Sequence, residues 1–414
     1  MVEFERFTLD NGLRVIFHKD TTTPMVVVNT LYDVGARDEN PDRTGFAHLF
    51  EHLMFGGSVN IPNFDRPLEL AGGNNNAFTT NDLTNYYDIL PAQNIETALW
   101  LESDRMLSLA FTEKSLKIQK NVVIEEFKQN YLNQPYGDLW LELSPLAYQK
   151  HPYQWTTIGK SIDHIKNSTM EEVKSFFNKY YHPGNAIITI AGNLEFENVK
   201  MLVNKWYADI PGKEKIIRKL PKEPQQNEFR TKTIVRDVPS DMYIYAFKMP
   251  GKAEKDFPAV DLISDVLGHG KTSRLNRHLR KNLELASDIE SYVTGTLDTG
   301  LLIIMVQPDE AATLEEIDME IWTVLEKLKA SSIYEDELNK IVNKVKTSKA
   351  FEEQGILNKS IILSMFELMG DANLINTEIK EYEKVTPDDI QRVARRILNP
   401  KNCSRLIIQS KDHA

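Results

Sequence analysis

The sequence predicts an α+β fold made of two similar domains, each a mostly antiparallel sheet with helices packed on one face. Two observations support this prediction. Segments with the periods of strands and of helices follow one another in the same order in both halves of the 414-residue chain. Between the halves, residues 213–232 are polar and rich in Lys and Pro, as interdomain linkers are. We therefore expect an N-terminal domain over residues 1–212 and a C-terminal domain over residues 233–414.

The elements of the two halves can be placed in order. After its opening strands and a helix with two histidines, the first half is expected to form a strand over 86–90, helices over 94–105, 115–130 and 170–180, and a strand over 186–190. The second half is expected to form a strand over 242–247, a helix over 257–267, a strand over 301–306, helices over 314–328, 334–350 and 387–398, and a strand over 404–408. The helix over 257–267 contains no histidine, so metal binding is expected in the first domain alone.

Composition indicates a globular protein. The chain is 41% hydrophobic and 26% charged, and no apolar run is long enough to cross a bilayer. Its formal net charge of −11 argues against nucleic acid as a partner. The N-terminal residues lack the basic region and apolar core of a secretory signal, and the single cysteine, Cys403, excludes an intrachain disulfide and a cysteine zinc site within one chain. These features favour a cytoplasmic location, although a secreted form whose signal had been removed would share them.

The most informative segment is Gly45-Phe-Ala-His-Leu-Phe-Glu-His-Leu-Met-Phe-Gly-Gly57. On a helix, His48 and His52 lie one above the other, and Glu51 leans toward the same face. Two neutral imidazole nitrogens can bind a divalent metal, and a carboxylate beside them can take a proton from the water that the metal activates. The order H-x-x-E-H is the inverzincin signature of zinc peptidases. It therefore predicts a zinc-dependent peptidase.

The alternative is an amphipathic helix whose histidines serve only packing or the surface. The helix is apolar around most of its circumference, because it contains Phe46, Leu49, Phe50, Leu53, Met54 and Phe55. Such a helix should be buried, and unpaired polar groups on a buried helix are costly. A metal would satisfy them, so we favour metal binding.

A third ligand is expected on the helix over 115–130. Glu125 and Glu126 are neighbours there and point about 100° apart, so one of them can face inward while the other faces solvent. Geometry alone leaves the choice between them open.

The chain resembles the pitrilysin, insulinase and mitochondrial-processing-peptidase family of zinc endopeptidases. In that family the third ligand is a Glu that ends a V-x-x-x-E run downstream of H-x-x-E-H. Here Val122-Val-Ile-Glu-Glu126 matches, at an offset of 126 − 52 = 74 residues, so the resemblance implies Glu126 as the ligand. Gln119 stands where many members have a further Glu. The resemblance covers most of the N-terminal half through five further landmarks, Leu9-Asp-Asn-Gly-Leu-Arg-Val-Ile16, Asn75-Asn-Ala-Phe-Thr-Thr80, Thr84-Asn-Tyr-Tyr87, His151-Pro-Tyr153 and Tyr181-His-Pro-Gly-Asn185.

The resemblance implies an endopeptidase with one Zn²⁺ per chain that hydrolyses peptides or unfolded segments inside a chamber formed by dimerisation. Glu51 would be the general base. Asn76, Ala77 and Phe78 resemble the edge strand that receives substrate as an added β-strand. The alternative for these three residues is a loop with turn-forming asparagines.

The second half of the chain indicates what a partner subunit would need to supply. Many members carry an Arg and, further along, a Tyr that contact substrate opposite the zinc. Arg280 matches the Arg, although it equally fits an exposed helix residue, and Ser287 stands where the Tyr is expected. A homologous partner with a complete Arg/Tyr pair, or a homodimer that uses Arg280 without the Tyr, would satisfy the pattern. Two alternative functions stay open, a noncatalytic or peptide-holding subunit and a maturation peptidase for one dedicated precursor.

Overall fold

Two compact units make up the computed structural model, which describes residues 1–413. The first contains Met1–Lys128, Trp155–Leu220 and Lys349–Thr377. The second contains Gln129–Gln154, Pro221–Ser348 and residues 378–413. Each unit therefore combines segments from both halves of the chain, whereas the predicted ranges 1–212 and 233–414 are contiguous.

The first unit is built on a six-stranded sheet in the order β1-β2-β6-β3-β5-β4. Its strands are β1 (Glu5–Thr8), β2 (Arg14–Lys19), β3 (Met25–Tyr32), β4 (Asn74–Thr79), β5 (Thr84–Pro91) and β6 (Ala186–Gly192). Neighbours are antiparallel except for β2 and β6, which are parallel. β3 lies in the interior of the sheet and is buried from Val26 onward, which suits its run of β-branched residues.

The second unit is built on a five-stranded sheet in the order β7-β11-β8-β10-β9. Its strands are β7 (Arg230–Arg236), β8 (Met242–Met249), β9 (Ala286–Val293), β10 (Gly300–Pro308) and β11 (Cys403–Ser410). β7 and β11 are parallel, and the other neighbours are antiparallel. This order and these directions repeat those of β2-β6-β3-β5-β4 in the first unit. The predicted α+β fold with two similar domains is thus confirmed.

Helices cover both sheets. Those of the first unit are α1 (Phe46–Leu53), α2 (Asp65–Leu70), α3 (Ile95–Leu107), α4 (Glu113–Glu126), α6 (Ile162–Lys166), α7 (Met170–Tyr180), α8 (Phe196–Tyr207) and α12 (Ile356–Met369). Those that lie wholly or mainly in the second unit are α5 (Leu139–Ala147), α9 (Phe257–Gly268), α10 (Leu314–Ala330), α11 (Glu335–Glu352), α13 (Leu374–Glu383) and α14 (Pro387–Ile397). Two π-helical segments are also present, η3 (Phe127–Leu132) and η6 (Asn276–Asn282).

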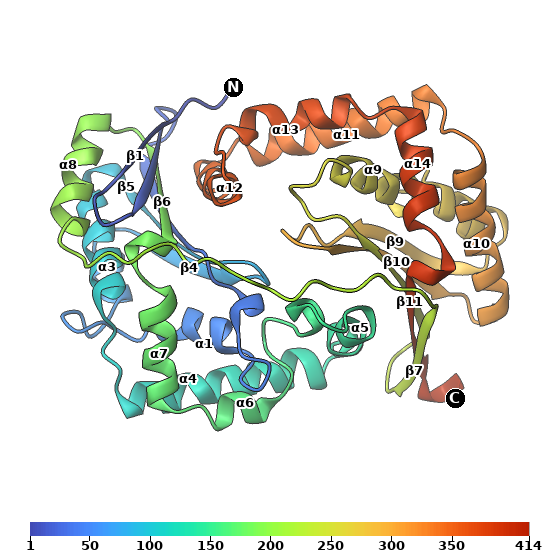
Figure 1. Ribbon diagram of the computed structural model, residues 1–414, viewed down its shortest axis with the longest axis horizontal. Coiled ribbons are helices and arrows are strands. Elements are labelled where there is room, and N and C mark those ends of the chain that lie inside the picture. The colour runs from blue at the N-terminus through green and yellow to red at the C-terminus, as the bar shows by residue number, and fades with distance from the viewer. Residues whose placement is uncertain (414) are drawn as a thin grey trace. The chain divides into compact units, whose positions relative to one another are not determined.

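One helix from each half of the chain packs on the sheet of the other half. α12 comes from the C-terminal half, yet its Leu363 joins the cluster of Ile16, Leu31 and Ile187 on the first sheet. Ser364 of the same helix accepts a hydrogen bond from Asn29 Nδ2 at 3.0 Å. In Figure 1, α12 is drawn in red beside strands that are blue and green. The first sheet is therefore completed by a helix far away in sequence.

α5 makes the reciprocal contact. This helix from the N-terminal half is drawn in teal beside the red strand β11 in Figure 1. Its Leu143 and Ala147 share a buried cluster with Ile244, Ile303 and Leu406 of the second sheet. Each sheet thus has helices on both faces, where the sequence predicted them on one. Helical periodicity identifies an apolar face but does not identify the sheet that it covers.

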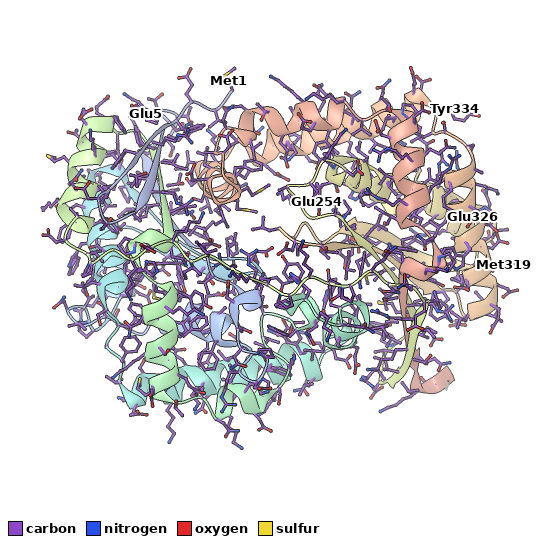
Figure 2. All side chains as sticks on the ribbon, viewed as in Figure 1. Met1, Glu5, Glu254, Met319, Glu326 and Tyr334 are labelled. Carbon is purple, nitrogen blue, oxygen red and sulfur yellow. The ribbon has the colours of Figure 1, made fainter. Side chains whose placement is uncertain are left out.

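Two surface properties complete the description. Exposed apolar side chains such as Met319 and Tyr334 stand at separate places on the second unit, as is ordinary for globular proteins (Figure 2). Within residues 1–413, the helices lack the combination of length and apolar character that a bilayer crossing needs.

Candidate metal centre

Helix α1 carries His48, Glu51 and His52, and its start is fixed by the loop before it. Gly45 precedes the helix with φ of 89°, a left-handed conformation in which a Cβ would also lie 2.7 Å from the Ile158 carbonyl oxygen. The amides of Gly45 and Ala47 donate to the two carboxylate oxygens of Glu39 at 2.9 and 2.8 Å. Burial raises the pKa of Glu39 to about 8, although these two amides lower it in part. The N-cap residue Gly45 has no side chain that could bind these amides, so the more distant Glu39 caps α1 in its place.

The structure brings His48, His52 and Glu126 together. The two Nε2 atoms lie 3.4 Å apart. Glu126 Oε2 lies 3.6 Å from Nε2 of His48 and 3.3 Å from Nε2 of His52. Tetrahedral zinc sites have bonds of about 2.0–2.2 Å, which place ligand atoms about 3.3–3.6 Å from one another. The three atoms therefore have the spacing of three corners of a zinc tetrahedron.

The protonation state of His48 also suits a metal. Burial, and then the neighbouring His52, lower the pKa of His48 to about 4. The imidazole is therefore neutral near pH 7 and offers a lone pair, which is the form that binds metals. The side chains of His48, His52 and Glu126 are 18%, 20% and 34% exposed, so the group is also open to solvent.

Helix α4 places the two candidate glutamates differently. Glu126 faces the histidines, whereas Glu125 is 59% exposed and accepts a hydrogen bond from Lys128 Nζ at 2.7 Å. The helix changes to π geometry immediately after Glu126, a feature often found at functional sites. On the geometry as well as the resemblance, Glu126 is the better candidate ligand.

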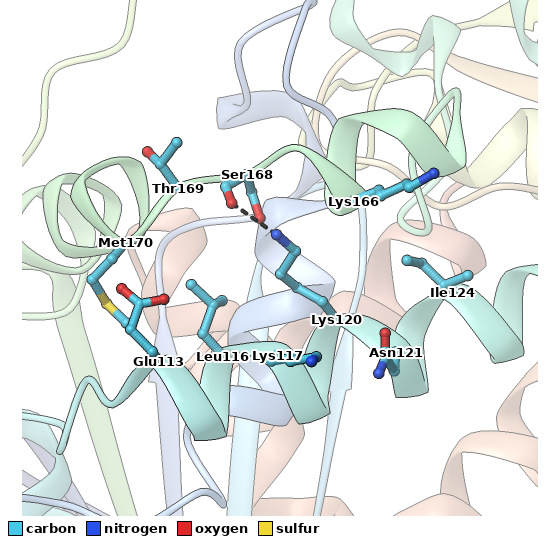
Figure 3. A pocket seen from close by; sticks show the side chains of 10 residues that line it. All are labelled: Glu113, Leu116, Lys117, Lys120, Asn121, Ile124, Lys166, Ser168, Thr169 and Met170. Carbon is cyan, nitrogen blue, oxygen red and sulfur yellow. Dashed lines mark hydrogen bonds between the residues drawn. The ribbon is translucent and has the colours of Figure 1, made fainter.

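Another face of α4 lines a pocket of about 560 Å³. Lys120 in this pocket donates to the carbonyl oxygen of Ser168 at 2.8 Å (Figure 3). The lining residues come from α4, the end of α6, the segment between α6 and α7 and the first residue of α7, and they do not include the three candidate ligands. This pocket is therefore separate from the candidate metal centre.

Glu51 contacts the sheet instead of joining the three ligand atoms. Its Oε2 accepts a hydrogen bond from the hydroxyl of Thr79 at 2.6 Å. Burial raises the pKa of Glu51, and the Thr79 hydrogen bond opposes this rise. A carboxylate with a raised pKa beside a metal group is suited to accept and then release a proton. The contact with Thr79 was not predicted, although Thr79 lies within the quoted motif Asn75-Asn-Ala-Phe-Thr-Thr80.

The segment that contains Asn76, Ala77 and Phe78 is the edge strand β4 and not a loop. Thr80 N donates to Leu83 O at 2.8 Å, so the amide of Thr80 faces the chain of β5. Main-chain groups alternate in direction along an antiparallel strand, and those of Ala77 and Thr79 therefore face the free edge of the sheet. Such an edge can accept a further strand.

The side chains of β4 alternate between the two faces of the sheet. Phe78 packs against the cluster that contains Leu363 of α12. Asn76 Oδ1 accepts a hydrogen bond from the Ala77 amide at 2.8 Å, which gives that edge amide a partner within the strand. The main-chain groups of Phe78 face β5, so Phe78 would support the edge strand without binding an added peptide strand.

Arg280 lies in the second unit, within the π-helical segment η6. Its side chain is 46% exposed, and its guanidinium lies 3.8 Å from the Asp288 carboxylate. Ser287, at the position of the expected Tyr, donates from its hydroxyl to the Gln307 carbonyl oxygen at 3.2 Å. Arg280 is thus an accessible cation on the surface of its unit.

The sequence was also compared with known proteins. Residues 14–160 match the sequence profile described as Insulinase (Peptidase family M16), and residues 167–345 match Peptidase M16 inactive domain. The zinc protease PqqE of Helicobacter pylori is 33% identical over 343 residues, which cover 81% of this chain and 77% of that protein. The uncharacterized zinc protease YmxG of Bacillus subtilis is 26% identical over 415 residues, covering 98% of each protein.

A solved structure extends the similarity to the whole fold. The crystal structure of a protease from Helicobacter pylori matches with a TM-score of 0.92 and 29% identity, covering 99% of this chain and 100% of that one. Two sequence profiles and a relative of 33% identity thus confirm the predicted resemblance. The chain belongs to the M16, or insulinase, family of peptidases.

Proposed function

We propose that the protein is a zinc-dependent endopeptidase that hydrolyses peptides or unfolded segments of proteins. One observation carries the proposal: the ligand atoms of His48, His52 and Glu126 have the mutual spacing that a single zinc ion requires. Relatives named zinc proteases support the choice of metal.

Each residue of the site would have a separate role. His48 and His52 would hold the ion through neutral imidazole nitrogens, and Glu126 would hold it through a carboxylate oxygen. A bound zinc ion would supply the Lewis acidity that activates water and polarises the scissile carbonyl. Glu51 would accept the proton of the attacking water and pass it to the departing amine.

The edge strand would hold the substrate. A peptide that pairs with the free edge of β4 gains main-chain hydrogen bonds, which give affinity with weak dependence on sequence. Among Asn76, Ala77 and Phe78, Ala77 would bind the peptide through its main chain, and Asn76 and Phe78 would hold the edge strand in place through their pairing with β5. Such binding requires an extended segment, and it therefore favours peptides and unfolded regions over folded proteins.

Dimerisation would complete the chamber. Arg280 is accessible, and Ser287 stands where an Arg/Tyr pair would have its Tyr. A homologous subunit with the complete pair would supply it, and in a homodimer Arg280 would act without it. The noncatalytic, peptide-holding role is the alternative, and it predicts zinc without turnover.

The test combines metal analysis with a cleavage assay. Zinc content and cleavage of a mixed peptide library would be measured for the wild-type chain and for Glu51→Gln, alone and with any copurifying homologue. We expect one zinc per chain in both proteins and a loss of rate of about a hundred- to ten-thousand-fold in the variant.

Each outcome separates the alternatives. Activity only with the homologue supports the heterodimer, and zinc with no cleavage in any combination supports the noncatalytic role. Near-normal turnover by Glu51→Gln would overturn the mechanism, and absence of zinc would overturn the enzyme assignment.

A further inference from the structure

We propose that Thr79 is a positioning residue that holds the carboxylate of Glu51 and couples its position to the peptide strand bound at the edge of β4. This inference rests on the proposed function, since it concerns the residue that would act as general base. It assigns Thr79 no contact with the reacting atoms.

Thr79 contacts Glu51 through a short hydrogen bond. The hydroxyl of Thr79 donates to Glu51 Oε2 at 2.6 Å, a distance typical of a strong hydrogen bond to a carboxylate. A glutamate side chain has several rotatable bonds and needs such a partner to keep its carboxylate in one place. Thr79 is well suited to this task, because its β-branched side chain has few allowed rotamers on a strand.

Thr79 pairs with Thr84 of β5 and is the last residue of β4. Because the amide of Thr80 donates to Leu83 O, the main-chain groups of its neighbour Thr79 face the free edge. The same residue thus presents its main chain to an incoming peptide strand and its hydroxyl to Glu51.

A bound peptide would affect Thr79 through its main chain. A peptide strand that pairs with β4 would form hydrogen bonds to the main chain of Thr79 and reduce the motion of that residue. Because the β-branched side chain of Thr79 has few allowed rotamers, the carboxylate of Glu51 would be held more firmly when substrate is bound. Substrate binding at the edge would therefore help to prepare the base.

The experiment compares Thr79→Val, which removes the hydroxyl at nearly constant shape, with Thr79→Ser, which keeps it. Thr84→Val is the matched control, because the hydroxyl of Thr84, the residue paired with Thr79, donates to the Val34 carbonyl oxygen at 2.8 Å instead of to Glu51. Any loss of thermal stability in Thr79→Val can be compared with the loss in this control.

The first readout is structural and independent of activity. Crystal structures of the three variants and the wild type would show the carboxylate of Glu51. We expect it to move by more than about 0.5 Å, or to lose order, in Thr79→Val, and to stay in place in Thr79→Ser and Thr84→Val. An unmoved, ordered carboxylate in Thr79→Val would overturn the inference.

The second readout is kinetic. We expect kcat of Thr79→Val to fall about 10- to 100-fold, because a displacement of about 1 Å can cost a hundredfold in rate. KM and zinc content should stay near the wild-type values, since the main chain and the ligands are unchanged, and Thr79→Ser should recover most of kcat. If Thr79→Val keeps kcat while Glu51→Gln loses it, the inference fails and the proposed function stands. If Glu51→Gln keeps its activity, the proposed function fails, and the structural readout still tests the contact.

Discussion

Leu363 provides a direct test of the exchanged helix α12, because it belongs to the C-terminal half of the chain and packs on the first sheet. It is fully buried in a cluster with Ile16, Leu31 and Ile187, and these residues are at most 1% exposed. The substitution Leu363→Ala should therefore weaken β3 and β6, which are more than 160 residues away in sequence (356 − 192 = 164).

The size of the effect follows from burial. Removing three carbon groups from a buried site costs about 2.4 kcal/mol at about 0.8 kcal/mol each. A residual cavity of about 60 Å³ adds about 1.4 kcal/mol at about 24 cal/mol per Å³. The neighbours are held between a sheet and a helix and have little room to collapse, so the total should approach about 4 kcal/mol.

Hydrogen exchange measured by mass spectrometry is the suitable assay, because a chain with two compact units does not guarantee a single two-state transition. A loss of about 4 kcal/mol lowers the protection of amides that exchange through this opening by nearly a thousandfold. Peptides from β3 and β6 should show that loss. The control is Leu143→Ala in α5, which should instead affect β8 and β11.

Leu363→Ala and Leu143→Ala should increase hydrogen exchange in different sheets. If Leu363→Ala left β3 and β6 protected and increased exchange only in α11, α12 and α13, the packing of α12 on the first sheet would be refuted. Equal effects of both variants on both sheets would refute the division into two units.

Two further predictions concern the candidate metal centre. Glu126→Gln should lose zinc, measured by elemental analysis after dialysis, whereas the exposed neighbour variant Glu125→Gln should keep one ion per chain; equal zinc in both would refute Glu126 as the ligand. Burial raises the pKa of Glu39 from an ordinary value of 4.5 to about 8, so the folded state favours the protonated form. Its contribution to stability is therefore fully present below about pH 4.5 and is lost as the pH rises through about 8. The free energy of unfolding should fall by at most about 1.4 kcal/mol per pH unit through this group. Urea unfolding of wild type and Glu39→Gln should show wild type losing stability relative to the variant over this range, and a constant difference would contradict the prediction.

Local sequence patterns were sufficient for much of the fold and for part of the site. The spacing of His48, Glu51 and His52 places them on one side of a short helix whatever the rest of the chain does. The strands β6 and β8 and the helix α7 lie where the alternation and the helical period predict them. Such patterns are properties of neighbouring residues, so they can be recognised without knowledge of the tertiary structure.

Contacts between distant segments could not be predicted in this way. The pairing of Glu126 with His52 depends on how α4 packs beside α1, and the choice of Glu126 over Glu125 came from family resemblance. The bond between Thr79 and Glu51 depends on the register of β4 against β5. The amides capped by Glu39 depend on the fold of a loop. The hydrophobic repeat of a single helix or strand contains no information about these three contacts.

The reciprocal exchange of α5 and α12 sets an order of events during synthesis of the chain. The first sheet is complete in sequence at Gly192, the end of β6, but the helix that covers its second face ends at Met369, which is 369 − 192 = 177 residues later. At about 5–20 residues per second, a ribosome needs about 9–35 seconds to make that segment. Throughout this interval the apolar face that contains Ile16 and Leu31 lacks its helix and is open to aggregation or to chaperones. The unit with the candidate metal centre therefore matures near the end of translation, although His48, His52 and Glu126 lie within the first third of the chain.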